Sequence, residues 1–220
     1  MTGSAGRPGV LAKICGLTTA EAVDAAVAGG AAFVGFVFFA GSPRDIVPES
    51  ARRLARAARG KARIVAVTVD PDDALIDRLS AILAPDLIQL HGGETPARAR
   101  EIALRSGVEV IKAVPVSAES DLDGAPDYEA AGARLMFDAK APAGAPAPGG
   151  MGAPFDASFL AGRRFERPWF LAGGLDPWNV AEAARRSGAP IVDVSSGVER
   201  GRGLKDPALI QAFLEAVRRA

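Results

Sequence analysis

The sequence predicts a single-domain (β/α)8 barrel, the TIM-barrel class of α/β fold, and three observations support it. Short apolar runs alternate with amphipathic, Ala- and Arg-rich stretches along the whole chain. Proline or glycine stands at most boundaries between them, where helices begin and end. The length of 220 residues is usual for one such barrel. An open doubly wound sheet is the structural alternative.

The predicted strands are the apolar runs, most of them rich in Val, Ile, Leu or Phe. Strands that are covered by helices have this composition because both of their faces are buried. The eight predicted strands are Val10–Cys15, Phe33–Phe39, Arg63–Val69, Asp86–Leu90, Glu109–Val114, Arg134–Asp138, Pro168–Leu171 and Ile191–Val194.

The predicted helices lie between these runs. Thr18 precedes Glu21 in the spacing of a capping box, so we expect Thr18 to begin the first helix. Segment 117–132 holds a weaker helix pattern. The other predicted helices are Thr18–Ala28, Pro48–Arg59, Pro71–Leu83, Thr95–Arg105, Asp176–Ser187 and Pro207–Arg219.

Two stretches lie outside this alternation. Residues 1–9 are small, polar and Gly-rich, which predicts a disordered lead-in before a barrel domain at residues 10–220. Residues Ala141–Pro154 are rich in Pro, Gly and Ala without periodicity, which predicts a long loop. This loop follows the predicted sixth strand, so we expect it at the end of the barrel where active sites lie.

Composition argues against several classes of partner. Lys plus Arg and Asp plus Glu both number 26, so neither a broad nucleic-acid surface nor a polybasic membrane patch is expected. The longest apolar run, Ala31–Ala40, is too short to span a bilayer, and we expect a cytoplasmic protein. Cys15 is the only cysteine, so it is either a buried apolar filler or a working thiol.

The reactive side chains gather at the predicted C-terminal ends of the strands, which meet at one rim of a barrel. The only Cys, the only His, two Asp and an Arg fall there, and core packing does not explain this clustering. The candidate site residues are Cys15, Arg44, His91, Asp138 and Asp193. Lys112, on the fifth strand between Ile111 and Ala113, is expected instead to pack its stem inside the barrel and pair its charge.

Two Gly-containing loops predict a phosphate site. Gly173 and Gly174 follow the predicted seventh strand and precede a predicted helix, and Ser195, Ser196 and Gly197 follow the eighth strand. Barrels commonly bind phosphate with the loops at these two positions, through backbone N–H groups that glycine lets the ligand approach. Glycine also fills ordinary turns, but its presence in both loops favours phosphate binding.

In order along the chain, these motifs resemble those of the phosphoribosylanthranilate isomerase family. The resemblance covers essentially the whole chain after residue 9, except that Met151 and Ala153-Pro154 replace a hydroxyl and a lysine in the loop after strand six. The matching motifs are Lys13-Ile14-Cys15-Gly16-Leu17-Thr18, Gly35-Phe36-Val37-Phe38, Ser42-Pro43-Arg44, Gln89-Leu90-His91-Gly92, Phe137-Asp138-Ala139-Lys140, Gly173-Gly174-Leu175 and Val192-Asp193-Val194-Ser195-Ser196-Gly197-Val198-Glu199.

The resemblance implies an Amadori rearrangement of N-(5-phosphoribosyl)anthranilate in tryptophan biosynthesis, with no metal and no organic cofactor. It makes Asp138 the general acid that protonates the ring oxygen and Cys15 the general base that removes the C2′ proton. Arg44 would pair with the anthranilate carboxylate, and Asp193 would support the reacting centre. His91 is either substrate-lining or structural. The protein would be a monomer or a homodimer whose partner is this small phosphosugar-anthranilate substrate.

The acid and the base make opposite demands on their surroundings. A free thiol ionises near pH ~8.5, so a Cys base needs a nearby positive charge, and Lys13 on the same strand face is the candidate. The acid must hold a proton near neutrality, which burial among apolar neighbours such as Met136 favours for Asp138.

Three rival functions suit the same fold. An indole-glycerol-phosphate synthase would use a Lys and Glu set, and a dual-substrate isomerase that also serves histidine synthesis would use paired Asp. A non-catalytic phosphate-binding barrel needs neither Cys15 nor Asp138. The presence of both residues favours the single-substrate isomerase.

Overall fold

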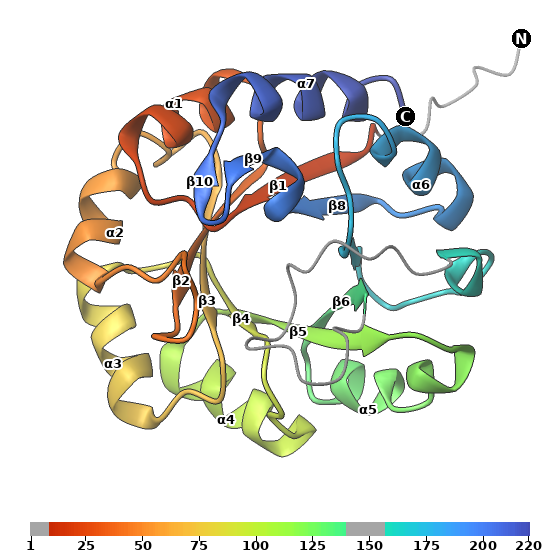
Figure 1. Cartoon of the computed structure of the whole chain (residues 1–220). Coiled ribbons are helices and arrows are strands. Elements are labelled where there is room, and N and C mark those ends of the chain that lie inside the picture. The colour runs from red at the N-terminus through yellow and green to blue at the C-terminus, as the bar shows by residue number, and fades with distance from the viewer. Residues whose placement is uncertain (1–8, 140–156) are drawn as a thin grey trace, which may run out of the picture.

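The computed structural model describes residues 9–139 and 157–220. Within them, eight parallel strands pair in chain order from β1 to β8, and β8 pairs back with β1. Figure 1 shows the helices as a ring around these strands. The predicted barrel is confirmed, and the open doubly wound sheet is excluded because the β1–β8 pairing leaves no free sheet edge.

The described elements alternate as predicted. The strands are β1 (Leu11–Cys15), β2 (Phe33–Phe38), β3 (Arg63–Thr68), β4 (Leu87–Leu90), β5 (Glu109–Val116), β6 (Arg134–Ala139), β7 (Phe170–Leu171) and β8 (Ile191–Val194). The α-helices are α1 (Ala20–Ala28), α2 (Pro48–Ala55), α3 (Asp73–Ile82), α4 (Pro96–Ser106), α5 (Ala125–Ala130), α6 (Val180–Ser187) and α7 (Pro207–Val217).

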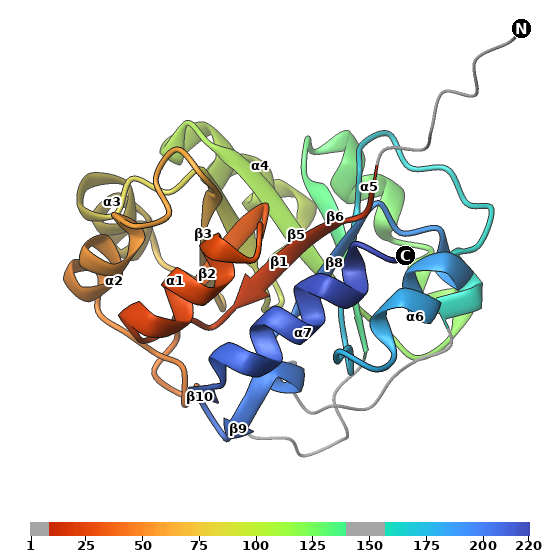
Figure 2. The same cartoon turned by 90° about the horizontal axis from the view of Figure 1, so that it is seen from above.

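Shorter elements complete the described chain. A two-stranded antiparallel hairpin of β9 (Glu199–Gly201) and β10 (Leu204–Lys205) follows β8, and the sequence analysis did not predict it. Figure 2 shows this hairpin at the end of the barrel toward which β1 runs. The 3₁₀ helices are η1 (Glu119–Leu122), η2 (Ala157–Leu160) and η3 (Ser196–Val198).

The predicted start of the first helix is wrong by one residue. Thr19, and not Thr18, is the N-cap, with an extended backbone and a hydroxyl that accepts from the Ala22 N–H at 3.3 Å. A capping side chain must face the first free N–H groups of the helix, and this geometry outweighs the sequence spacing of Thr18 and Glu21.

Strand alternation divides the buried side chains into two layers. Ile14, Phe137 and Val194 point outward into the large core between the strands and the helices. Cys15 and Met136 point inward and pack in the barrel interior. The inward face also carries buried polar groups, which are Lys13, Gln89, Asp138 and Asp193. Polar side chains inside the barrel need partners, and these partners shape the site described below.

Two predicted features lie outside the described residues. These are the lead-in, of which only Gly9 is described, and the loop at Ala141–Pro154. In the described ranges, no helix is long and apolar enough to cross a membrane.

A buried ion pair fastens the loops that follow β3 and β4. Lys112 Nζ lies 2.7 Å from Glu94 Oε2 and donates to the Gly92 carbonyl at 2.6 Å. The Glu94 carboxylate also accepts from the backbone N–H groups of Asp70 and Gly92, at 2.8 and 3.0 Å. The predicted pairing of the Lys112 charge is therefore confirmed, and the ion pair steadies the loop that begins at His91. The prediction that its stem lies inside the barrel is wrong, because Lys112 shares the outward face of β5 with Val110 and Val114.

We predict that Lys112→Met lowers the free energy of unfolding by about 3–5 kcal/mol, because it leaves the Glu94 carboxylate buried without its cation. Arg105→Met is the matched control, since Arg105 pairs with Asp73 and Asp77 at the surface and its loss should change stability little. Urea unfolding followed by circular dichroism measures both variants. Equal stability of the two variants would contradict the structural role of Lys112.

Candidate active site

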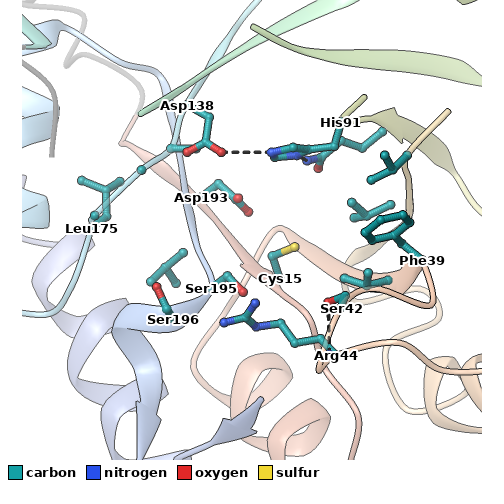
Figure 3. Close-up of a pocket in the computed structure, with 18 residues that line it drawn as sticks. Cys15, Phe39, Ser42, Arg44, His91, Asp138, Leu175, Asp193, Ser195 and Ser196 are labelled. Carbon is teal, nitrogen blue, oxygen red and sulfur yellow. Dashed lines mark hydrogen bonds and ion pairs between the residues drawn. The ribbon is translucent and has the colours of Figure 1, made fainter. Parts of the chain in front are cut away.

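A pocket opens where the C-terminal ends of the strands meet. Figure 3 shows side chains from β1, β6 and β8 pointing into it, with Arg44 entering beside Ser195 and Ser196. Of the predicted site residues, those that line the pocket are Cys15, Arg44, His91, Asp138, Gly173, Gly174, Asp193, Ser195 and Ser196. The exception is Gly197, which the structure describes but does not place among the lining residues.

A buried ion pair joins the first and last strands beneath this pocket. Lys13 Nζ lies 2.7 Å from Asp193 Oδ1, and the Lys13 side chain is fully buried. The two residues are direct register partners in the β1–β8 pairing. Cys15 follows on the same face of β1, one step closer to the pocket. The ion pair therefore sets the charge environment of the thiol.

Burial raises the pKa of the Cys15 thiol above its ordinary value of 9.0, and the Asp193 carboxylate adds to the rise. The cations of Lys13 and Lys205 favour the thiolate but do not outweigh these effects. Burial acts to lower the pKa of Lys13, while Asp193 and Cys15 together hold it above 10.5. The expected effect of the Lys13 charge on the thiol is therefore present, but burial outweighs it and the net shift of the Cys15 pKa is upward.

The candidate acid, Asp138, is held by a chain of side chains. Asp138 Oδ2 lies 3.0 Å from His91 Nε2, as the dashed line in Figure 3 marks. His91 Nδ1 in turn lies 2.9 Å from Gln89 Nε2. Asp138 is only 5% exposed and lies above Met136 on the inward face of β6, as predicted. Gln89 was not predicted as a site residue, although its place two residues before His91 on β4 gives it the same inward orientation.

Arg44 is held by a carboxylate that the sequence analysis did not assign to the site. Its Nε and Nη2 donate to the two Glu199 oxygens at 2.6 and 2.9 Å, a bidentate arrangement. Lys205 Nζ forms an ion pair with the same carboxylate and donates to the Ser195 carbonyl at 3.0 Å. Glu199 ends the last matching motif and Lys205 follows six residues later, but the sequence alone does not show that they meet Arg44.

The side chains of this group of charges are largely buried. Burial acts to raise the pKa of Glu199, but the hydrogen bonds from Arg44 and Lys205 hold it below 4.5. Burial lowers the pKa of Lys205, and the Glu199 carboxylate offsets only part of this effect. Glu199 therefore remains an anion and fixes the position of the Arg44 guanidinium at the edge of the pocket.

The two glycine loops approach other backbone segments too closely for any side chain. Gly173 has a left-handed backbone with φ 89°, and a Cβ there would lie 2.3 Å from the Ala139 nitrogen. At Gly197, a Cβ would lie 1.9 Å from the Leu175 carbonyl oxygen. Gly197 thus brings the loop after β8 against the loop after β7, although it does not itself line the pocket.

The helix predicted to begin at Asp176, just after Gly174, starts later. The Asp176 carboxylate accepts from the N–H groups of Trp178 and Asn179 at 2.8 and 2.9 Å, so these residues form a turn and α6 begins at Val180. The Asn179 side chain then donates to the Gly174 carbonyl at 2.8 Å. A polar turn, and not the first turn of α6, therefore holds the glycine loop.

The arrangement suits acid–base chemistry on a small bound molecule. A buried carboxyl group from β6 and a buried thiol from β1 face one pocket, so they can add a proton to one atom of a ligand and remove one from another. Across residues 9–139 and 157–220, no three His, Cys, Asp or Glu side chains gather as metal ligands.

Comparisons with known proteins agree on one family. The family model of N-(5'phosphoribosyl)anthranilate (PRA) isomerase matches residues 12–216. The N-(5'-phosphoribosyl)anthranilate isomerase of Caulobacter sp. (strain K31) is 66% identical over 211 residues, which cover 96% of this chain and 99% of that protein.

Two solved structures are similar over nearly the whole chain. The crystal structure of phosphoribosyl anthranilate isomerase from Thermotoga maritima has a TM-score of 0.86 and 38% identity, with 96% of this chain and 100% of that chain covered. A crystal structure of phosphoribosyl anthranilate isomerase in complex with reduced 1-(o-carboxyphenylamino)-1-deoxyribulose 5-phosphate has a TM-score of 0.83 and 35% identity, with the same coverage.

We predict that the pKa of the Cys15 thiol lies above that of a free thiol, because burial favours the neutral form. Because the pKa is raised, the thiolate fraction is small at neutral pH and grows as the pH rises through the pKa of the thiol. Ultraviolet absorbance of the thiolate measures it, with Cys15→Ser as the blank, since the chain has no other cysteine. A titration midpoint at or below that of a free thiol would contradict the dominance of burial over the Lys13 charge.

Proposed function

This chain belongs to the N-(5'-phosphoribosyl)anthranilate isomerase family, and from this premise we propose which of its residues carry the reaction. The enzyme isomerises N-(5-phosphoribosyl)anthranilate to its 1-deoxyribulose isomer in tryptophan biosynthesis. The observation that supports the residue assignment is that one buried acid, Asp138, and one buried thiol, Cys15, line a single pocket.

In the first step, Asp138 gives its proton to the furanose ring oxygen. The C1′–O bond breaks, and the anthranilate nitrogen shares its electron pair with C1′ to form a Schiff base. Asp138 becomes a carboxylate, which the neighbouring His91 Nε2 can stabilise by donating a hydrogen bond. The burial of Asp138 keeps competing water away from this proton transfer.

In the second step, the Cys15 thiolate removes the proton from C2′. The electrons move toward the cationic Schiff base and give an enolamine, which tautomerises to the ketone. The high pKa of Cys15 makes its thiolate a stronger base, although less of it is present at neutral pH. One turnover leaves the Asp138 proton on the C4′ oxygen of the product and the C2′ proton on Cys15, and exchange with water restores both groups.

The remaining residues hold the substrate. We assign its phosphate to the loops at Gly173-Gly174 and Ser195-Ser196, which Gly197 allows to pack closely. Arg44, held by Glu199, offers its remaining N–H groups to the anthranilate carboxylate. Asp193 supports the reacting centre through its ion pair with Lys13 beneath Cys15.

The proposal needs no metal and no organic cofactor, because two proton transfers balance the atoms of an isomerisation. Every assigned group comes from one chain, so the protein can act as a monomer or as a homodimer with two separate sites.

The base must remain a free thiol, and the reducing cytoplasm is the compartment that maintains one. We assign no nucleic-acid or membrane partner, since the only ligand that the proposed reaction requires is the small phosphosugar-anthranilate substrate.

Replacing either proton-transfer residue tests the assignment. Cys15→Ala and Asp138→Asn should each lower kcat by at least about a hundredfold, because one general acid or base typically supplies 10²–10⁴ in rate. Binding of the reduced product analogue, measured by calorimetry, should survive in both variants. Near-normal turnover in either variant would remove that residue from the mechanism.

Arg44 separates recognition from chemistry. Arg44→Ala should lower kcat/KM about 10–150-fold, mainly through KM, because the charge-assisted contact exists in both the ground state and the transition state. Arg44→Lys should recover only part of the loss, since ammonium lacks the bidentate fork. If Arg44→Ala has the KM of the wild-type enzyme in steady-state assays, another cation binds the carboxylate.

A further inference from the structure

Gln89 has a buried amide oxygen without a hydrogen-bond partner among residues 9–139 and 157–220. The residue is 1% exposed and lines the pocket from the inward face of β4. Its Nε2 lies 2.9 Å from His91 Nδ1, whereas its Oε1 has no hydrogen-bond partner in the described part of the chain. A buried polar atom normally has a partner, so an unsatisfied one that borders a ligand pocket indicates a group that the ligand satisfies.

The orientation of this amide decides which nitrogen of His91 carries the hydrogen. With the amide nitrogen facing the ring, as it does here, the NH2 group can only donate, and His91 Nδ1 is then the acceptor. The hydrogen of the neutral ring then lies on Nε2, which donates to Asp138 Oδ2 at 3.0 Å. Turning the amide over would place Oε1 against His91 Nδ1, move the ring hydrogen to Nδ1 and leave Nε2 as an acceptor.

The two orientations have opposite consequences for Asp138. With the hydrogen on His91 Nε2, Asp138 Oδ2 is occupied as an acceptor, and Oδ1 is the oxygen left to carry a proton to the substrate. With the hydrogen on Nδ1, only a protonated Asp138 could bond to Nε2, and its proton would point away from the substrate. The amide orientation of Gln89 therefore matters to the proposed acid.

We propose that Gln89 is a positioning residue that also binds substrate, its Oε1 accepting a hydrogen bond from the C2′ hydroxyl. The inference rests on the function proposed above. The donors of the substrate are its amine N–H and its C2′ and C3′ hydroxyls, and of these the C2′ hydroxyl lies on the carbon that Cys15 deprotonates. When this hydroxyl donates to Oε1, the amide is held in the orientation in which its NH2 group faces His91 Nδ1, and His91 Nε2 then donates to Asp138.

This contact also distinguishes substrate from product. The C2′ oxygen carries a hydrogen in the substrate, in the Schiff base and in the enolamine, but it becomes a carbonyl oxygen in the ketone product. A carbonyl cannot donate to Gln89 Oε1, so the contact is lost when the reaction is complete. The reduced product has a hydroxyl in place of the carbonyl, and it should regain the contact.

The first test compares the binding of these two ligands by calorimetry. The measurement uses a Cys15→Ala background, in which the ketone is not turned over. Adding Gln89→Leu should reduce the preference for the reduced product over the ketone by about three- to tenfold, the usual effect of one hydrogen bond. Gln211→Leu is the matched control, because Gln211 is the other glutamine of the chain and bonds to Ala25 between α7 and α1.

The second test reads the tautomer of His91 directly by nitrogen-15 NMR, since the chain has no other histidine. We expect the hydrogen on Nε2 in the wild-type protein. Gln89→Glu, which keeps an acceptor oxygen but cannot donate to His91, should move the hydrogen to Nδ1 while preserving the ligand preference. This variant also keeps a polar side chain at position 89 if Gln89→Leu fails to fold.

The outcomes separate this inference from the proposed function. An unchanged ligand preference in Gln89→Leu, equal weakening of both ligands, or a wild-type His91 with its hydrogen on Nδ1 would each overturn the role of Gln89. Turnover that persists in the Cys15→Ala background would instead overturn the proposed base and leave the Gln89 measurements intact.

Discussion

The buried ion pair between Lys13 and Asp193 is the interaction on which the rest of the pocket depends. It joins β1 to β8 inside the barrel, where the sheet closes on itself. Two isolated charges in this interior would be costly, so each residue needs the other, and the pairing ties closure of the fold to the position of both groups. Cys15 then lies in a nearly neutral, buried environment, which explains why its thiol stays protonated at rest.

Two further carboxylates fix the mouth of the pocket in the same way. The Glu199 carboxylate pairs with Arg44 in the loop after β2 and with Lys205 in β10. It thereby joins the loop after β2 to the hairpin that follows β8. The Glu94 carboxylate pairs with Lys112 and accepts a hydrogen bond from the backbone N–H of Gly92, in the loop that begins at His91. Each paired carboxylate holds a loop in place before any ligand arrives, and such preorganisation is what acid–base catalysis requires.

The barrel and the rim residues could be predicted because both depend on local patterns. Strands buried on both faces have continuous apolar runs, and the ends of parallel strands bring residues such as Cys15 to one rim. Contacts between distant segments could not be predicted, since nothing near Arg44 points to Glu199, which lies 155 residues away. The sign of the Cys15 pKa shift depends on burial, and the start of a helix near Thr18 depends on backbone geometry, so neither follows from spacing.

The central claim is that Cys15 and Asp138 transfer protons at two nearby positions of one bound substrate, C2′ and the ring oxygen. A crystal structure of this chain with the reduced product analogue tests it most directly. The account predicts Cys15 Sγ at about 3–3.5 Å from C2′, the near-attack distance, and the Asp138 carboxyl group within hydrogen-bond distance of the C4′ oxygen that left the ring. An analogue whose C2′ lies out of reach of Cys15, or whose sugar binds away from Asp138, would contradict it.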